Sequence, residues 1–135
     1  MSMPQIDTSA WPIVLITYPG PGTLIETRLF IEKLAPIYQR GMSEPFVSIN
    51  DLRLLAQSKV LPEVRSSLNS GVNELLAAYP GSKIGEARVV PTLALRAAHA
   101  AANMTRRCPF PMAVFTKVED ARRWGQQLVG ARRKQ

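Results

Sequence analysis

Short apolar segments alternate with amphipathic segments along this chain, and this order constrains the fold more than any other feature. The first apolar segment, Ile13–Thr17, is rich in β-branched residues and lacks polar alternation, which predicts a strand buried on both faces. Further strands are predicted at Phe46–Asn50, Glu86–Val90 and Met112–Phe115. Strands that alternate with helices predict an α/β domain with right-handed crossovers, a mainly parallel or mixed sheet of four to five strands, and about four helices.

The segments between the strands carry apolar residues at helical spacing. Thr23 and Glu26 have the spacing of a capping box, which predicts the start of the first helix. Pro36 lies inside this helix and is expected to kink it or to end it near Leu34, with Gly41 as a later stop. Three more helices are predicted, over Leu61–Tyr79, from the cap residue Thr92 to about Met104, and over Val118–Ala131.

The length of 135 residues suits one domain with a sizeable core. Residues 1–10 are expected to be a flexible N-terminus or an antiparallel edge strand, residues 11–130 the single domain, and residues 131–135 a basic tail. No apolar segment approaches the roughly 20 residues of a membrane-spanning helix, and the features of a secretory signal are missing. One cysteine, Cys108, cannot form an internal disulfide, so we expect a cytoplasmic protein.

Three local patterns accompany this order of elements. They are the strand that leads into an acid, Phe46–Asp51; the strand–helix unit Val89–Thr92; and the C-terminal unit Pro109–Phe115, which continues to Val118–Trp124. Together they resemble the STAS domains (sulphate transporter and anti-sigma factor antagonist), in particular the bacterial SpoIIAA-like branch, over residues 11 to 130. The resemblance implies a four-helix, mixed-sheet domain that acts through protein contacts or small-ligand binding, without catalysis.

One position departs from the pattern of that family. Classical anti-sigma factor antagonists carry a phosphorylatable serine just after the acid that ends the strand. Here Asp51 is followed by Leu52 and Arg53, and the nearest downstream hydroxyl, Ser58, is displaced. We therefore do not expect the classical kinase-controlled switch, and we expect Arg53 to form a local ion pair with Asp51.

The architecture predicts one candidate site, the rim formed by the carboxyl ends of the parallel strands, where ligands of open α/β sheets bind. Helix N-termini at this rim offer free N–H groups that suit phosphate or carboxylate, although Thr23 and Thr92 can also serve simply as helix caps. The candidate residues for binding a ligand or partner are Thr23, Asn50, Asp51, Arg53, Ser58, Thr92 and Arg96.

Catalytic and metal-binding patterns are not convincing in this sequence. His99 is the only histidine and lies among alanines in a predicted helix, so it is not placed beside a nucleophile. One histidine and one cysteine do not supply the ligands of a zinc site, and the Gly20–Gly22 turn lacks the spacing of a phosphate loop. We predict no catalytic residues, no metal and no cofactor.

Positive charge is concentrated in the last third of the chain. Residues 88–135 hold ten basic and two acidic residues, a net charge of +8, whereas residues 1–87 hold seven and eight. Electrostatic binding to nucleic acid through this third would be strongly salt-dependent, but no aromatic residues interleave with the basic ones for base stacking. A solvated basic surface is the simpler interpretation, and its candidate residues are Arg106, Arg107, Arg122 and Arg123.

These observations favour a non-enzymatic regulatory module of bacterial type that contacts another protein or binds a small ligand. Two alternatives stay open at this point: an anionic-ligand protein or minor enzyme that uses the rim, and an electrostatic nucleic-acid binder. Another protein is the favoured partner and nucleic acid the disfavoured one, and an exposed edge strand would allow a homodimer.

Overall fold

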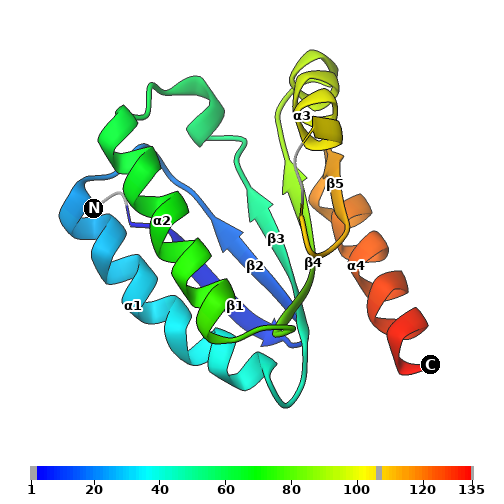
Figure 1. The fold of residues 1–135 in the computed structure, drawn as a ribbon. Coiled ribbons are helices and arrows are strands. Elements are labelled where there is room, and N and C mark those ends of the chain that lie inside the picture. Colours follow the sequence, from blue (N-terminus) through cyan, green and yellow to red (C-terminus); the bar gives the residue numbers. More distant parts are fainter. Residues whose placement is uncertain (1–2, 106–107, 135) are drawn as a thin grey trace.

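The computed structural model describes residues 3–105 and 108–134, and these form one sheet with helices around it (Figure 1). The predicted α/β class is confirmed, and strand β5 matches its predicted bounds. Along the chain the elements are β1 Gln5–Ala10, β2 Ile13–Thr17, α1 Leu24–Gly41, β3 Phe46–Asp51, the 3-10 turn η1 Leu55–Gln57, α2 Pro62–Ala78, β4 Lys83–Val89, α3 Leu93–Thr105, β5 Met112–Phe115 and α4 Val118–Arg133.

The strands lie in the sheet in the same order as in the sequence, β1-β2-β3-β4-β5. β1 pairs antiparallel with β2, so residues 5–10 form the edge strand, and every other neighbouring pair is parallel. The sheet is therefore mixed and mainly parallel. Because parallel neighbours need a crossover, each of α1, α2 and α3 connects two adjacent strands.

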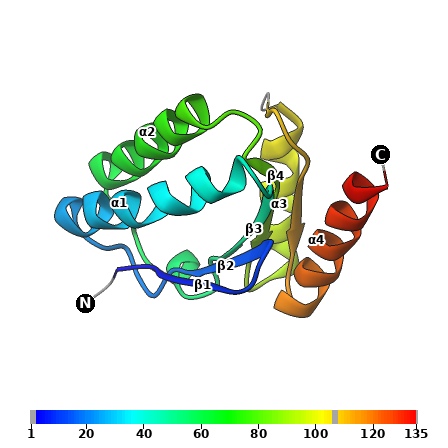
Figure 2. The ribbon, with the colours of Figure 1, turned by 90° about the horizontal axis from the view of Figure 1, so that it is seen from below.

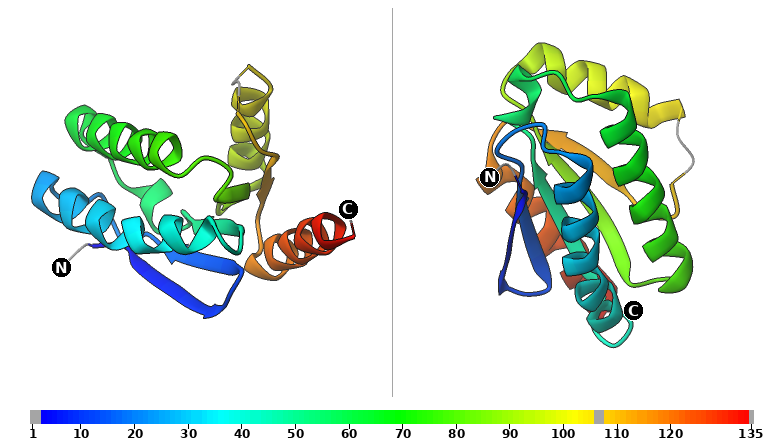
Figure 3. Two further views of the ribbon diagram at one scale, coloured as in Figure 1. Left: turned by 60° about the horizontal axis from the view of Figure 1, so that its bottom comes forward. Right: turned by 90° about the vertical axis from the view of Figure 1, so that its left-hand side faces the viewer.

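The helices cover the two faces of the sheet unequally. α1 and α2 pack side by side on one face, and α4 packs on the opposite face against β3, β4 and β5 (Figure 2). α3 lies against β5, and its axis runs across the direction of α2 (Figure 3). As a result, the face that carries α1 and α2 is not closed by a third parallel helix.

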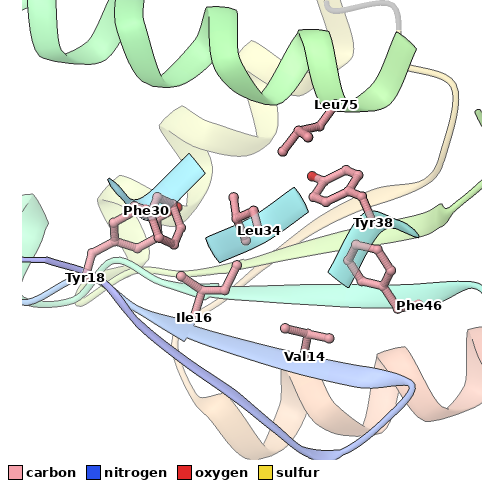
Figure 4. Packing of buried hydrophobic residues seen from close by; sticks show 8 residues of the cluster. All are labelled: Val14, Ile16, Tyr18, Phe30, Leu34, Tyr38, Phe46 and Leu75. Atoms are coloured by element: carbon pink, nitrogen blue, oxygen red, sulfur yellow. The ribbon is translucent and has the colours of Figure 1, made fainter. Parts of the chain in front are cut away.

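Two apolar clusters hold the layers together, one on each face of the sheet. The cluster under α1 and α2 is visible in Figure 4, where Tyr18 and Phe30 lie at one end and Tyr38 and Phe46 at the other. The cluster under α4 is built from alternate residues of β2, β3 and β4: Ile13, Val47, Ile49, Ala87 and Val89, with Ala121 and Val129. Alternation along β2 and β3 thus supplies both cores, while β4 supplies buried residues only to the cluster under α4.

The structure corrects the predicted early end of the first helix. α1 does not stop near Leu34 but continues through Pro36 to the later stop at Gly41. Leu34 and Tyr38 flank the proline and are both buried in the same cluster, so tertiary packing outweighs the lost backbone hydrogen bond. At Gly41 the chain passes so close to Ser82 that an added Cβ would lie 2.8 Å from the Ser82 carbonyl oxygen.

Two other element ends differ from the prediction by more than one residue. β4 begins at Lys83, three residues before the expected start, because the charged Lys83 is buried in an ion pair rather than exposed in a loop. α4 continues through Arg133, so the first residues of the expected basic tail are helical. Two interactions stabilise this last turn: basic residues face the negative end of the helix dipole, and Arg133 lies 3.5 Å from the Glu44 carboxylate.

Candidate functional site

A cleft opens on the sheet face that α1 and α2 cover only in part. It consists of two adjoining hollows of about 330 Å³ and 440 Å³, a size suited to a small organic molecule. One hollow reaches α3 and the other runs along α2 over β3 and β4. Both share the same central wall residues, Tyr18, Leu52, Leu55, Arg65 and Leu68. We call the combined space the α2–α3 cleft.

The hollow next to α3 has mainly apolar walls. Phe30 of α1, Val64 of α2 and Leu95 of α3 line it, together with the turn Gly20–Gly22. The turn can follow the strand closely because Gly22 adopts a positive φ of 66°. This part of the cleft offers a low-polarity space for the body of a ligand.

The hollow along α2 has a polar floor. Asn50 projects from β3, and Glu86 and Arg88 project from β4. In the parallel pairing Ser48 is opposite Glu86 and Asn50 is opposite Arg88, which places all four side chains on one face of the sheet. We call these four residues the polar floor, although Ser48 lies beneath the cleft and does not line it.

Glu86 is the centre of a charged network in this floor. Its Oε1 lies 2.6 Å from the Lys83 ammonium, and its Oε2 accepts a hydrogen bond of 3.3 Å from the Arg88 Nε–H. Burial raises the pKa of Glu86, but the two cations outweigh burial and hold the pKa below its ordinary value. Burial likewise lowers the pKa of Lys83, and Glu86 together with Tyr38 more than reverses this. The three groups therefore stay charged and carry a net charge of +1.

Polar atoms in the floor are left without partners. The Asn50 Oδ1 and the Ser48 Oγ are buried and have no hydrogen bond among the described residues. Arg88 uses only its Nε–H, and its other N–H groups make no hydrogen bond to any described residue. Buried polar groups in a folded protein are nearly always paired, so this end of the cleft has unused hydrogen-bonding capacity.

Two titratable side chains complete the walls. Burial raises the pKa of the Tyr18 hydroxyl, which keeps it protonated. Burial, and secondarily the charge of Arg88, lowers the pKa of His99, so the imidazole is neutral at neutral pH. The described walls therefore present Arg88 and Arg65 as cations, and neutral His99 and Tyr18 as uncharged polar groups.

The rim residues predicted from the sequence are brought together only in part. Ser58 and Asn50 line the α2–α3 cleft. Thr23 accepts from the Glu26 N–H and Thr92 accepts from the Leu95 N–H, so both serve as helix caps. The Arg96 Nε–H donates to the Val114 carbonyl oxygen at 3.1 Å, which ties α3 to β5.

The predicted ion pair between Asp51 and Arg53 is confirmed. The Arg53 Nε–H and Nη2–H donate to the two Asp51 carboxylate oxygens at 2.9 Å and 2.8 Å, and the Arg53 backbone N–H donates at 3.2 Å. Burial raises the pKa of Asp51, and the hydrogen bonds from Arg53 more than compensate, so the pKa is lowered. This carboxylate is fully engaged by its own loop and does not enter the cleft.

The described part of the predicted basic surface lies away from the cleft. Arg106 and Arg107 fall outside the described residues, while Arg122 and Arg123 lie on α4, which packs on the opposite face of the sheet. The Arg123 guanidinium is 3.8 Å from the Asp120 carboxylate. Nucleic-acid binding by this surface stays a prediction.

Sequence reasoning missed Glu86 and Arg88 as site residues. The sequence does contain a polar–apolar alternation with a period of two residues. In β3, Ser48 and Asn50 alternate with Val47 and Ile49. In β4, Glu86 and Arg88 alternate in the same way with Ala87 and Val89. Such a pattern indicates a strand with one polar face. The alternation indicates a binding site only once it is known that β3 pairs with β4, because this pairing places the two polar faces side by side.

Comparisons with known proteins identify the fold. No family model matches the chain, and no curated protein matches its sequence. The structure is similar to that of an uncharacterized protein of the DUF3478 family with a SpoIIAA-like fold from Shewanella loihica PV-4, with a TM-score of 0.59 over 90% of this chain and 91% of that chain. The two sequences are 16% identical. The expected SpoIIAA-like fold is therefore confirmed.

The described residues lack both a cluster of metal ligands and a membrane-spanning helix. Within 3–105 and 108–134, no three His, Cys, Asp or Glu side chains gather in a group that could hold a metal ion. In the same part of the chain, no helix has the length and apolar character needed to cross a bilayer.

Proposed function

We propose that this protein is a non-enzymatic regulatory module of SpoIIAA-like fold that binds a small molecule in the α2–α3 cleft. The observation that carries the proposal is the combination of an apolar hollow with a floor whose buried polar atoms lack partners. Pockets for small ligands typically have mainly hydrophobic walls and a few polar groups that fix the orientation of the ligand.

The position of the cleft in the fold supports this proposal. The hollow next to α3 is lined by Tyr18, Gly20 and Leu52, which follow the carboxyl ends of β2 and β3, where ligands of open α/β sheets usually bind. Its walls come from α1, α2, η1 and α3, so a bound molecule would contact most elements on this face. A ligand that bridges α2 and α3 could alter the surface that both helices present to a partner.

A fragment screen followed by two-dimensional ¹H–¹⁵N NMR tests the proposal. Binders are expected to shift amide signals of Leu55, Leu68 and Leu95, which come from three different elements of the cleft. Asn69→Trp on the cleft wall should block these shifts, whereas Ser66→Trp, an exposed position of α2 outside the cleft walls, should leave them. A screen whose binders all map elsewhere, for example to α4, would contradict the proposal.

Contact with another protein is a second candidate function, and an apolar surface beside the cleft favours it. Leu24 and Ile25 at the start of α1 and Leu61 before α2 are 40%, 71% and 56% exposed and line a shallow hollow. Cross-linking mass spectrometry in native cells, with wild type compared to Ile25→Lys, tests this role. A partner on this surface should lose its cross-links in the variant; cross-links that persist unchanged would argue against it.

A further inference from the structure

The net positive charge of the Lys83–Glu86–Arg88 network specifies the chemical class of the ligand, an inference that rests on the proposed function. We propose that the α2–α3 cleft selects organic acids: Arg88 receives the carboxylate and Asn50 accepts a hydrogen bond from a neighbouring hydroxyl of the same ligand. The apolar hollow toward α3 holds the body of the molecule.

Arg88 is suited to a carboxylate by both charge and geometry. Its Nε–H is held by Glu86, which fixes the guanidinium, while the remaining N–H groups have no partner among the described residues. A fixed guanidinium with free N–H groups can donate two parallel hydrogen bonds to a carboxylate. Only 19% of the Arg88 side chain is exposed, so solvent screens this interaction weakly.

The charges around Arg88 favour an anion. Lys83 neutralises Glu86 at 2.6 Å, so Arg88 is left without a full countercharge in the floor. Arg65 on the cleft wall adds a second positive charge. The other acidic side chain lining the cleft, Glu26, accepts a hydrogen bond from the Thr23 backbone in the capping box.

Asn50 supplies the second element of recognition. Asn50 and Arg88 are register partners on adjacent parallel strands, so their Cα atoms are separated by one strand spacing, about 4.8 Å. The buried Asn50 Oδ1 lacks a donor. A hydroxyl close to the carboxylate of the same ligand, for example in meta relation on an aromatic ring, would supply that donor.

Isosteric probes of different charge test the inference by calorimetry and NMR. For the wild-type protein, 2-naphthoate should bind at least tenfold more tightly than the neutral 2-naphthamide, and 4-hydroxy-2-naphthoate several-fold more tightly still. If the amide binds the cleft as well as the acid does, the preference for organic acids is wrong, while the proposed small-ligand function stands. If no probe and no fragment binds in the cleft, both proposals fail.

Variants assign the two contacts. Arg88→Gln should remove most of the advantage of 2-naphthoate over 2-naphthamide, while Arg122→Gln, the same change on α4, should leave it intact. Asn50→Leu should remove only the advantage of the hydroxyl. Because the probe series on wild type needs no substitution, the inference stays testable even if Arg88→Gln is poorly folded. Unchanged selectivity in a folded Arg88→Gln protein would overturn the role of Arg88.

Discussion

The Lys83 ammonium lies 2.6 Å from the Glu86 carboxylate in the interior of the sheet, with both side chains at most one-tenth exposed. Buried ions that lose their partner retain their desolvation cost without its compensation. Lys83 also lies over the ring of Phe110, 5.1 Å from its centroid, so this cation anchors the segment that leads into β5. The pair therefore links the start of β4 to the polar floor of the cleft.

Glu86→Gln should lower the free energy of unfolding by about 3 kcal/mol, because Lys83 keeps a hydrogen-bond acceptor but loses the charge that compensates its burial. Urea denaturation measures the change. Glu44→Gln is the matched control: Glu44 pairs with Arg133 at the surface, and its loss should cost under about 1 kcal/mol. Equal losses for the two variants would show that the buried pair contributes no more than a surface pair.

Asp51 should make stability depend on pH in the acidic range. Its pKa in the folded protein is below the ordinary value of 3.8, so its stabilising effect is complete above that value and is lost as the pH falls through the lower folded pKa. Asp51→Asn and Arg53→Ala should therefore both show a smaller decrease in stability between about pH 4 and pH 2 than wild type. Acid titrations followed by circular dichroism measure this. A wild-type slope that persists in both variants would assign the acid sensitivity to other carboxylates.

Much of the fold could be predicted from local patterns. β2 and β5, the capping box of α1 and the Asp51–Arg53 pair follow from residues that are close in the sequence, and the structure confirms them. The start of β4 could not be predicted, because a lysine at position 83 is typical of an exposed loop and its buried partner Glu86 is known only from the structure. The continuation of α1 beyond Pro36 could not be predicted either, because the residues that stabilise it by packing lie on β2 and β3.

The candidate site was predictable only at its margin. The rule that ligands bind at the carboxyl ends of parallel strands led to Asn50 and Ser58, which do line the cleft. Arg88 lies one residue before the end of β4, and its role depends on two non-local facts, its pairing with β3 and the crosswise orientation of α3. Neither can be obtained from the sequence of one strand.

Two glycines should respond in opposite ways to alanine. Gly41→Ala should destabilise the protein by about 1–3 kcal/mol, because the new methyl group would overlap the Ser82 carbonyl oxygen and the Phe46 ring. Gly130→Ala in α4 meets no atom within 4 Å and should stabilise by up to about 1 kcal/mol through helix propensity. Thermal melts of both variants check the pair. A neutral Gly41→Ala would mean that α1 can shift away from β4 at low cost.

Thr23→Ala tests whether this rim residue acts as a cap. Its hydroxyl oxygen accepts from the Glu26 N–H at 3.1 Å, and Glu26 reciprocates by accepting from the Thr23 N–H at 3.0 Å. Loss of the cap should cost about 1 kcal/mol, while Thr23→Ser should cost little. Both variants should retain full ligand affinity in the cleft. A loss of affinity in a stable Thr23→Ala protein would instead give this threonine a binding role.

The unpaired polar atoms of the floor should lower the stability of the free protein. Ser48 is 2% exposed and its Oγ has no partner among the described residues, so Ser48→Ala should stabilise by about 1 kcal/mol by removing an unsatisfied hydroxyl. Asn50→Leu should also stabilise by about 1 kcal/mol, because it replaces a buried oxygen without a donor.

Denaturant titrations measure the effect of each variant on stability, and calorimetry with 4-hydroxy-2-naphthoate measures its effect on ligand binding. Only Asn50→Leu should lose the contribution of the ligand hydroxyl, since Ser48 does not line the cleft. A polar atom that is retained for ligand binding should lower the stability of the ligand-free protein, so its removal should stabilise that protein. If Asn50→Leu clearly destabilises the free protein, Asn50 supports the fold rather than the ligand.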